Sequence, residues 1–309
     1  MKNGYISITQ KCSHNCLACP CGSAAKQYKD LSLDKIQKTI QCGIQEKMID
    51  RIIVSGGEPM FHPQFFEILE FLVSTELTIS LLTTCEAISD KKFLDQILKL
   101  APVHRLRITT AIHSFKSGMH DFMTNCPGSF IKSMNGVHNA ISAGIPTSIK
   151  YLISGYTYRD MQEYVIHYYN TFPNNVSLAI CNLDLKNVEA KQIPGLKVPF
   201  VDLKPYLESA LDYVIEQSEI GRKRTVKVFD TPYCAIDSQY WTFLQSLQDY
   251  SMSVFNAPFV NEHKVRFNIS SDVAPIFEPC KRCKLKSSCP GTWSSAKEVF
   301  GEEVFNPFV

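Results

Sequence analysis

The stretch Arg51-Ile52-Ile53-Val54-Ser55-Gly56-Gly57-Glu58-Pro59 joins a short run of β-branched apolar residues to a glycine-rich turn. Such a run favours a buried strand, and glycines at its end let the backbone approach another group closely. Similar apolar runs alternate with amphipathic stretches from the start of the chain to about residue 182. This alternation predicts an α/β fold whose parallel sheet is open or curled into a partial barrel.

The predicted elements follow this rhythm until residue 182. We expect strands at 6–9, 51–54, 77–83, 105–111, 147–153 and 176–180, and helices at 32–44, 65–74, 90–100, 130–143 and 160–169. Ser32 is the expected N-cap of the first helix, and Gly144 the glycine that ends the fourth. The ligand site of such a sheet lies at the carboxyl ends of its strands, where residues 12–19 and 56–59 fall.

Beyond residue 182 the pattern changes. Residues 186–201 resemble a linker, residues 203–220 a helix and residues 226–229 a short strand, whereas residues 235–309 have little periodicity. The sequence therefore predicts a core at 1–182, a linker and helix at 183–224, and a small cysteine-rich domain at 225–309.

Composition excludes several classes of protein. The 309 residues are 45% hydrophobic, and the net charge of +2 is too small for a general nucleic-acid binder. No run of about 20 apolar residues and no signal peptide is present, so we expect a cytoplasmic protein without a membrane span. Twelve cysteines in a reducing compartment then indicate metal ligation rather than disulfides.

The first cysteine group has the spacing CxxxCxxC, formed by Cys12, Cys16 and Cys19. Three thiolates on one loop can hold three irons of a [4Fe–4S] cluster and leave the fourth iron open to another ligand. A structural zinc ion would need a fourth protein ligand, which Cys21 or His14 could supply.

This motif after the first strand, followed by Gly56-Gly57-Glu58-Pro59 after the second, resembles the radical S-adenosylmethionine (SAM) superfamily over residues 1–182. The resemblance implies a partial (β/α)6 TIM-type barrel in which the three cysteines ligate the cluster and SAM chelates its open iron. It also implies that Gly56, Gly57, Glu58 and Pro59 contact the methionine end of SAM.

The chain departs from the usual superfamily pattern at three places. Ala18 stands where an aromatic residue is common, Thr83-Thr84-Cys85 replaces Thr-Asn-Gly, and Ala111 replaces a serine. By position, the candidate SAM contacts are Thr84, His113 and Lys150. The alternative is that these three are ordinary polar residues at strand ends.

The second cysteine group comprises Cys280, Cys283 and Cys289, with Cys234 upstream. Four thiolates can close the coordination of a second [4Fe–4S] cluster or of a zinc ion. Four basic residues lie in the same loop: Lys281, Arg282, Lys284 and Lys286. Their positive charges would stabilise the reduced state of a cluster. The alternative is that they form a solvated basic loop.

The order of these four cysteines is similar to the twitch or SPASM-type extension of radical SAM enzymes. It most resembles the maturases of His-Xaa-Ser-type systems, which modify ribosomally made peptides. The resemblance implies one auxiliary cluster in this domain, since only four cysteines are available there.

The remaining cysteines and histidines carry weaker expectations. Cys42 is expected in the core of an amphipathic helix, and Cys21 is expected to be a bystander. Hydrogen-atom donors to a substrate radical could be sought among Cys85, Cys126 and Cys181, although buried inert thiols are the simpler interpretation. His113 and His120 are expected at the surface or as caps.

The resemblance implies an oxidoreductase that cleaves SAM reductively and abstracts hydrogen from a precursor peptide, giving a cross-link, an epimer or another oxidised product. It implies a reductant such as flavodoxin or ferredoxin. The first strand begins by residue 5, so we expect no leader-binding domain before it, and a separate protein could present the leader. The alternatives are a radical SAM enzyme acting on a small molecule or nucleotide, and a non-catalytic zinc or iron–sulfur module.

Overall fold

A parallel sheet is the centre of the structure, a computed structural model that describes residues 3–19, 30–46, 49–186, 188–245, 252–255, 267–268 and 277–309. The strands in this part of the chain are β1 (Asn3–Thr9), β2 (Arg51–Gly56), β3 (Thr78–Leu82), β4 (Leu106–Ala111), β5 (Thr147–Leu152), β6 (Ser177–Cys181), β7 (Val226–Phe229), β8 (Leu244–Gln245), β9 (Met252–Phe255) and β10 (Phe267–Asn268). Their order is β10-β9-β1-β2-β3-β4-β5-β6-β7-β8. β10 pairs antiparallel with β9, and the other pairs are parallel.

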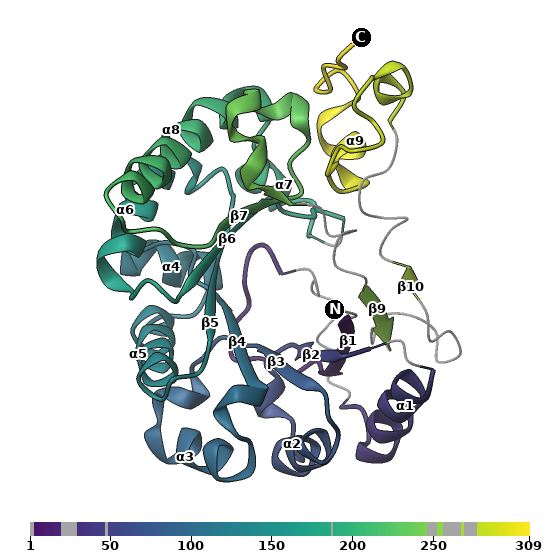
Figure 1. The fold of residues 1–309 in the computed structure, drawn as a ribbon, viewed down its shortest axis with the longest axis vertical. Coiled ribbons are helices and arrows are strands. Elements are labelled where there is room, and N and C mark those ends of the chain that lie inside the picture. Colours follow the sequence, from purple (N-terminus) through teal and green to yellow (C-terminus); the bar gives the residue numbers. More distant parts are fainter. Residues whose placement is uncertain are drawn as a thin grey trace.

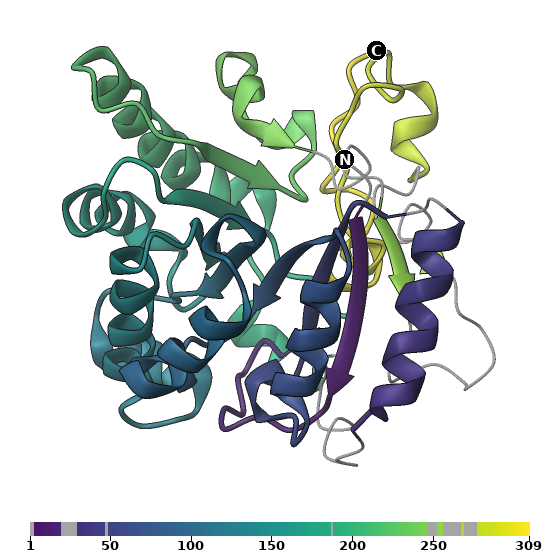
Figure 2. The same cartoon turned by 60° about the horizontal axis from the view of Figure 1, so that its bottom comes forward.

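Helices cover one face of this sheet. The described α-helices are α1 (Leu33–Gln45), α2 (Phe65–Ser74), α3 (Lys91–Leu100), α4 (Ser117–Thr124), α5 (Ser129–Ser142), α6 (Met161–Thr171), α7 (Ile193–Leu196), α8 (Phe200–Glu219) and α9 (Ser295–Phe300). The sheet curves into an open arc, and α2, α3, α5, α6 and α8 lie along its outer side (Figure 1). In the turned view, α1 stands beside β1 at one end of the arc (Figure 2). Not one of the described helices has both the length and the apolar composition to cross a membrane.

Side-chain alternation separates the core from the inside of the arc. In β5, Ile149 and Tyr151 are buried towards the helices, whereas Lys150 and Leu152 line a cavity on the other side. This period of two is that of a strand with two different faces. The main apolar core therefore lies between sheet and helices, and the concave face is left for polar chemistry.

The predicted parallel sheet and its alternating helices are confirmed. Ser32 caps α1 by accepting a hydrogen bond from the Lys35 amide at 3.3 Å, and Gly144 follows α5 with φ +78°. The sheet is wider than the predicted six strands, because β7 and β8 continue it beyond β6 and β9 pairs with β1. The helix α4, which the prediction missed, is only eight residues long.

The segment predicted as a linker packs on the cysteine loop. Leu185, Val188 and Leu196 form a buried apolar cluster with Ala18 and Met123. This cluster gives the residues after β6 a structural role that their irregular sequence did not indicate.

Candidate functional site

A cavity of 700 Å³ opens at the carboxyl ends of the strands, inside the arc. The predicted site residues that line it are Cys12, Cys16, Cys19, Gly56, Gly57, Thr84, His113 and Lys150. Segments from β1, β2, β3, β4 and β5 thus meet at one edge of the sheet, as parallel topology requires.

The cysteine loop is fixed to two neighbouring parts of the fold. The amides of Asn15 and Leu17 donate to the carbonyls of Thr124 at 3.0 Å and Met123 at 2.9 Å, at the end of α4. On the other side, the Gly57 amide donates to the Thr9 carbonyl at 2.8 Å. Backbone bonds therefore hold both flanks of the loop that presents the three thiols.

The two glycines after β2 allow a close approach of backbone to backbone. A Cβ atom on Gly57 would lie 2.2 Å from the Lys11 carbonyl oxygen, and one on Gly56 would lie 2.2 Å from that of Thr9. Gly56 also has φ +143°, which side chains disfavour. A side chain at either position would displace the segment that leads into Cys12.

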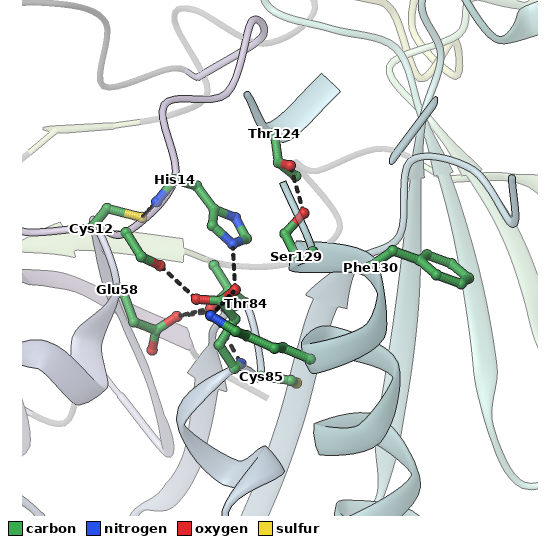
Figure 3. A network of polar contacts seen from close by, with 12 residues as sticks. Cys12, His14, Glu58, Thr84, Cys85, Thr124, Ser129 and Phe130 are labelled. Carbon is green, nitrogen blue, oxygen red and sulfur yellow. Dashed lines mark hydrogen bonds and ion pairs between the residues drawn. The ribbon is translucent and has the colours of Figure 1, made fainter. Parts of the chain in front are cut away.

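Glu58 joins this turn to the end of β3. It is fully buried, and its carboxylate accepts hydrogen bonds from the Thr83 hydroxyl at 2.8 Å and from the Thr84 amide at 2.7 Å (Figure 3). Burial raises the pKa of Glu58, while the hydrogen bonds from Thr84 lower it. Pro59, also buried, begins a single 3-10 turn, and the Met60 amide donates to Glu58. Glu58 is thus engaged by protein donors.

The three thiols fit an iron–sulfur cluster. Burial raises the pKa of Cys12 to about 12 and that of Cys16 further, and the neighbouring cysteines add to both shifts. Burial makes the thiolate form of these cysteines unfavourable unless positive charge neutralises it. Bound metal ions supply that positive charge. The sulfur atoms of Cys12, Cys16 and Cys19 do not all lie within 4.8 Å of one another; within the described residues, the group that meets this limit is His14, Glu86 and Cys126. The three thiols are therefore spaced more widely than the ligands of one zinc ion, which lie ~3.8 Å apart.

The fourth ligand needed for the zinc alternative is not supplied by His14. Its Nε2 lies 3.3 Å from a carboxylate oxygen of Glu86. Cys21, the other candidate, lies outside the described residues.

Two departures from the superfamily pattern, Ala18 and Cys85, differ in how well they suit the local structure. Ala18 is buried in the apolar cluster with Met123 and Leu185, so the local packing leaves it a small volume. Cys85 has φ +63°, the left-handed conformation that a glycine adopts easily. Its carbonyl lies so close to Gly136 on α5 that a Cβ there would clash.

The two histidines after β4 are buried, so the prediction of a surface position is wrong. His120 Nδ1 accepts a hydrogen bond from the His113 amide at 3.2 Å. Burial lowers the pKa of His113 to about 3 and that of His120 to about 4, so both rings are neutral near neutral pH. His113 reaches the cavity as an uncharged polar group.

The four remaining described cysteines differ in exposure. Cys42 is exposed on α1, and the prediction that it lies in the core is wrong. It lies off the buried stripe of that helix, to which Ile36 and Ile40 belong. Cys85 and Cys181 are buried, and burial raises the pKa of both thiols. Cys126 is partly exposed between α4 and α5.

The second cysteine group also converges. Cys234, Cys280, Cys283 and Cys289 line one small cavity of 50 Å³, together with the aromatic residues Tyr233, Phe277, Phe305 and Phe308. Burial raises the pKa of Cys234 to about 11, and Cys289 and Cys280 contribute. The basic side chains of this loop, Lys281, Arg282, Lys284 and Lys286, are all exposed.

Asp230 is a buried carboxyl group that the sequence interpretation missed. It follows β7 with φ +59°, is 3% exposed, and its Oδ1 has no hydrogen-bond partner within the described residues. Burial raises its pKa to about 7, which Lys150 opposes and Asp184 reinforces. The residue joins the barrel to the segment that carries the second cysteine group.

Comparison with known proteins agrees with this geometry. The radical SAM superfamily matches residues 6–166, which include the three cysteines and the turn after β2. The chain belongs to the radical SAM superfamily. Membership implies an enzyme with a SAM-binding [4Fe–4S] cluster.

Curated relatives are about a quarter identical to the chain over the residues that align. A probable GTP 3',8-cyclase from Methanocella arvoryzae is 24% identical over 140 residues, which cover 45% of this chain and 43% of that protein. The probable GTP 3',8-cyclase from Methanococcus vannielii is 23% identical over 278 residues, which cover 84% of this chain and 90% of that protein. An AdoMet-dependent heme synthase from Methanosarcina barkeri is 26% identical over 150 residues, covering 48% and 41%.

Solved structures share the fold at lower identity. Streptococcus suis SuiB bound to the precursor peptide SuiA has a TM-score of 0.62 and 11% identity, covering 86% of this chain and 62% of SuiB. The anSMEcpe protein with AdoMet and the Cp18Cys peptide has a TM-score of 0.64 and 13% identity, covering 99% and 92%.

Proposed function

We propose that this protein is a radical SAM oxidoreductase that modifies a ribosomally made precursor peptide. The observation that carries the proposal is the convergence of Cys12, Cys16 and Cys19 with Gly56 and Gly57 on one 700 Å³ cavity. When bound, the cluster of the three cysteines supplies the electron that cleaves SAM to methionine and a 5'-deoxyadenosyl radical, which abstracts hydrogen from the substrate.

The residues of this chain orient SAM and exclude water. The turn of Gly56 and Gly57 borders the cavity beside the thiols, where we place the methionine end of SAM. Glu58 and Pro59 contribute by shaping that turn, because Glu58 is already engaged by Thr83 and Thr84. His113 and Lys150 face the same cavity, and we assign them as polar contacts to SAM.

The second cysteine group is proposed to hold one auxiliary [4Fe–4S] cluster in a twitch or SPASM-like domain. Its four thiols line one cavity with an aromatic wall, and four ligands complete the coordination of such a cluster. A closed cluster can take an electron from the substrate but has no site for direct binding. A net oxidation of the peptide, such as a cross-link, follows from that role.

The charge of the cavity supports a peptide rather than a nucleoside triphosphate. In the described part of its lining the cationic side chains are Lys150 and Lys191. Lys191 already pairs with Glu189 at 2.9 Å. A triphosphate carries several negative charges and is commonly bound by arginines that grip it in bidentate fashion.

A nucleotide substrate is the second candidate, favoured by the relatives from Methanocella arvoryzae and Methanococcus vannielii, whose names specify GTP. The two candidates differ in what the enzyme consumes. A peptide enzyme needs a precursor, a reductant such as flavodoxin or ferredoxin, and in some systems a separate leader-binding protein.

The test is anaerobic reconstitution followed by two assays. With SAM and dithionite, the wild type is expected to produce 5'-deoxyadenosine, and Cys12→Ala is expected to produce none. Co-expression with a precursor peptide encoded nearby is expected to give a product with altered mass. Cys280→Ala is expected to cleave SAM without giving that product. Turnover of GTP without peptide modification would favour the second candidate.

A further inference from the structure

A buried polar network lies behind the first cysteine, outside the two motifs. Its centre is Glu86, which follows β3 and is 8% exposed. The Ser13 hydroxyl donates to one of its carboxylate oxygens at 2.7 Å, and His14 Nε2 lies 3.3 Å from the other. Lys132 on α5 approaches that second oxygen at 3.9 Å. Glu86 therefore contacts both residues that follow Cys12.

The position of His14 matters for the cysteine before it. The His14 amide donates a hydrogen bond to Cys12 Sγ at 3.4 Å (Figure 3). Hydrogen bonds to the sulfurs and nearby charges are two of the factors that set the reduction potential of an iron–sulfur cluster.

We propose that Glu86 is the positioning residue of the cysteine loop, which it holds through Ser13 and His14 while its charge lowers the reduction potential of the cluster. The inference rests on the cluster assigned under the proposed function. It concerns a residue that belongs to neither the cysteine motif nor the glycine turn.

A divalent metal ion is a poorer explanation of the same network. His14, Glu86 and Cys126 do bring three ligand atoms within 4.8 Å. However, the Glu86 carboxylate already accepts from Ser13 and faces the ammonium group of Lys132, which would repel a cation. These two contacts disfavour an ion on Glu86, while His14 Nε2 and the Glu86 oxygen that faces it make no hydrogen bond within the described residues.

The test uses the cluster-loaded full chain and five variants: Glu86→Gln, Glu86→Ala, Lys132→Met, Glu70→Gln and Cys126→Ala. Glu70 is exposed on α2 and serves as the matched control for loss of a carboxylate. The midpoint potential is measured by anaerobic redox titration with electron paramagnetic resonance. The signal that changes on addition of SAM identifies the cluster of Cys12. The second measurement is the rate of iron loss to a chelator.

Opposite charge changes should move the potential in opposite directions. Glu86→Gln is expected to raise the potential while keeping iron, because glutamine still accepts from Ser13 but carries no charge. Lys132→Met is expected to lower it by a smaller amount, because Lys132 is 60% exposed and screened by solvent. Glu86→Ala is expected to lose iron about ten-fold faster, since it releases the loop.

Each outcome has one consequence. If the wild type takes up no cluster, the proposed function fails. If it takes up the cluster and both Glu86 variants behave like Glu70→Gln, the function stands and the role of Glu86 is refuted. A stoichiometric zinc ion in the loaded wild type that is lost in Cys126→Ala would also overturn this role.

Discussion

Replacing Gly57 by alanine tests whether the glycine turn holds the cysteine loop. The added Cβ would meet the carbonyl oxygens of Lys11 at 2.2 Å and Gln10 at 2.7 Å, both rigid backbone atoms. To relieve this overlap, the segment after β2 must move away from the segment after β1. This movement weakens the hydrogen bonds from the Gly57 amide to Thr9 (2.8 Å) and from the Glu58 amide to Lys11 (2.7 Å). Two such hydrogen bonds contribute about 2 kcal/mol, and overpacking costs about 1–3 kcal/mol. The free energy of unfolding should therefore fall by about 3–5 kcal/mol.

Gly118→Ala is the matched control, since Gly118 lies in α4 with no atom within 4 Å of its added Cβ. There the helix propensity of alanine should stabilise the protein by about 0.5–1 kcal/mol. Urea unfolding of the apo-protein measures both changes. After reconstitution, Gly57→Ala should also contain about four fewer irons per chain, the content of one cluster. Equal stability of the two variants, with full iron in both, would refute the reasoning.

Three further variants test other parts of the structure. Burial raises the pKa of Asp230 from 3.8 to about 7, so folding favours the protonated form of this carboxyl group. The destabilisation that Asp230 causes therefore grows as the pH rises from 3.8 to about 7. Asp230→Asn should therefore stabilise the protein by up to about 4 kcal/mol near pH 8 and by almost nothing near pH 4, in melting curves at both pH values. Ala18→Phe should overpack the cluster with Leu185 and cost about 1–3 kcal/mol in urea unfolding. Arg224→Met should cost about 3 kcal/mol by the same measurement, because Arg224 donates to the carbonyls of residues 168, 169 and 172.

The parallel core could be predicted because local patterns and topology agree there. Each apolar run is short, each helix has one apolar stripe, and a β-then-α order admits few arrangements. The strand at 226–229 was likewise found from its pattern, and the structure has β7 with those bounds. The position of this strand in the sheet could not be predicted, because its pairing with β6 depends on contacts between residues that are distant in the sequence.

The position of the site could be predicted, but its polar support could not. Cys12, Cys16 and Cys19 were recognised by spacing, since one loop must bring all three thiols together. Glu86 has no spacing signal, as its partner Ser13 is 73 residues away. A carboxylate directly after Thr83-Thr84-Cys85 was the available sign, and it looks like any charged residue of a loop.

The contacts that Glu58 makes within the protein could not be predicted from its motif. From the sequence, the resemblance implied that Glu58 contacts the methionine end of SAM, which stays a prediction. In the structure that carboxylate is fully buried and accepts from Thr83 and Thr84. The glycines likewise leave room for the Thr9 and Lys11 carbonyls. The turn after β2 therefore acts as a clamp that fixes the end of β3 and the entry to the cysteine loop against each other. If the loop holds a cluster, this clamp would keep Cys12 in register with the turn, because the Gly57 and Glu58 amides donate to the carbonyls of Thr9 and Lys11.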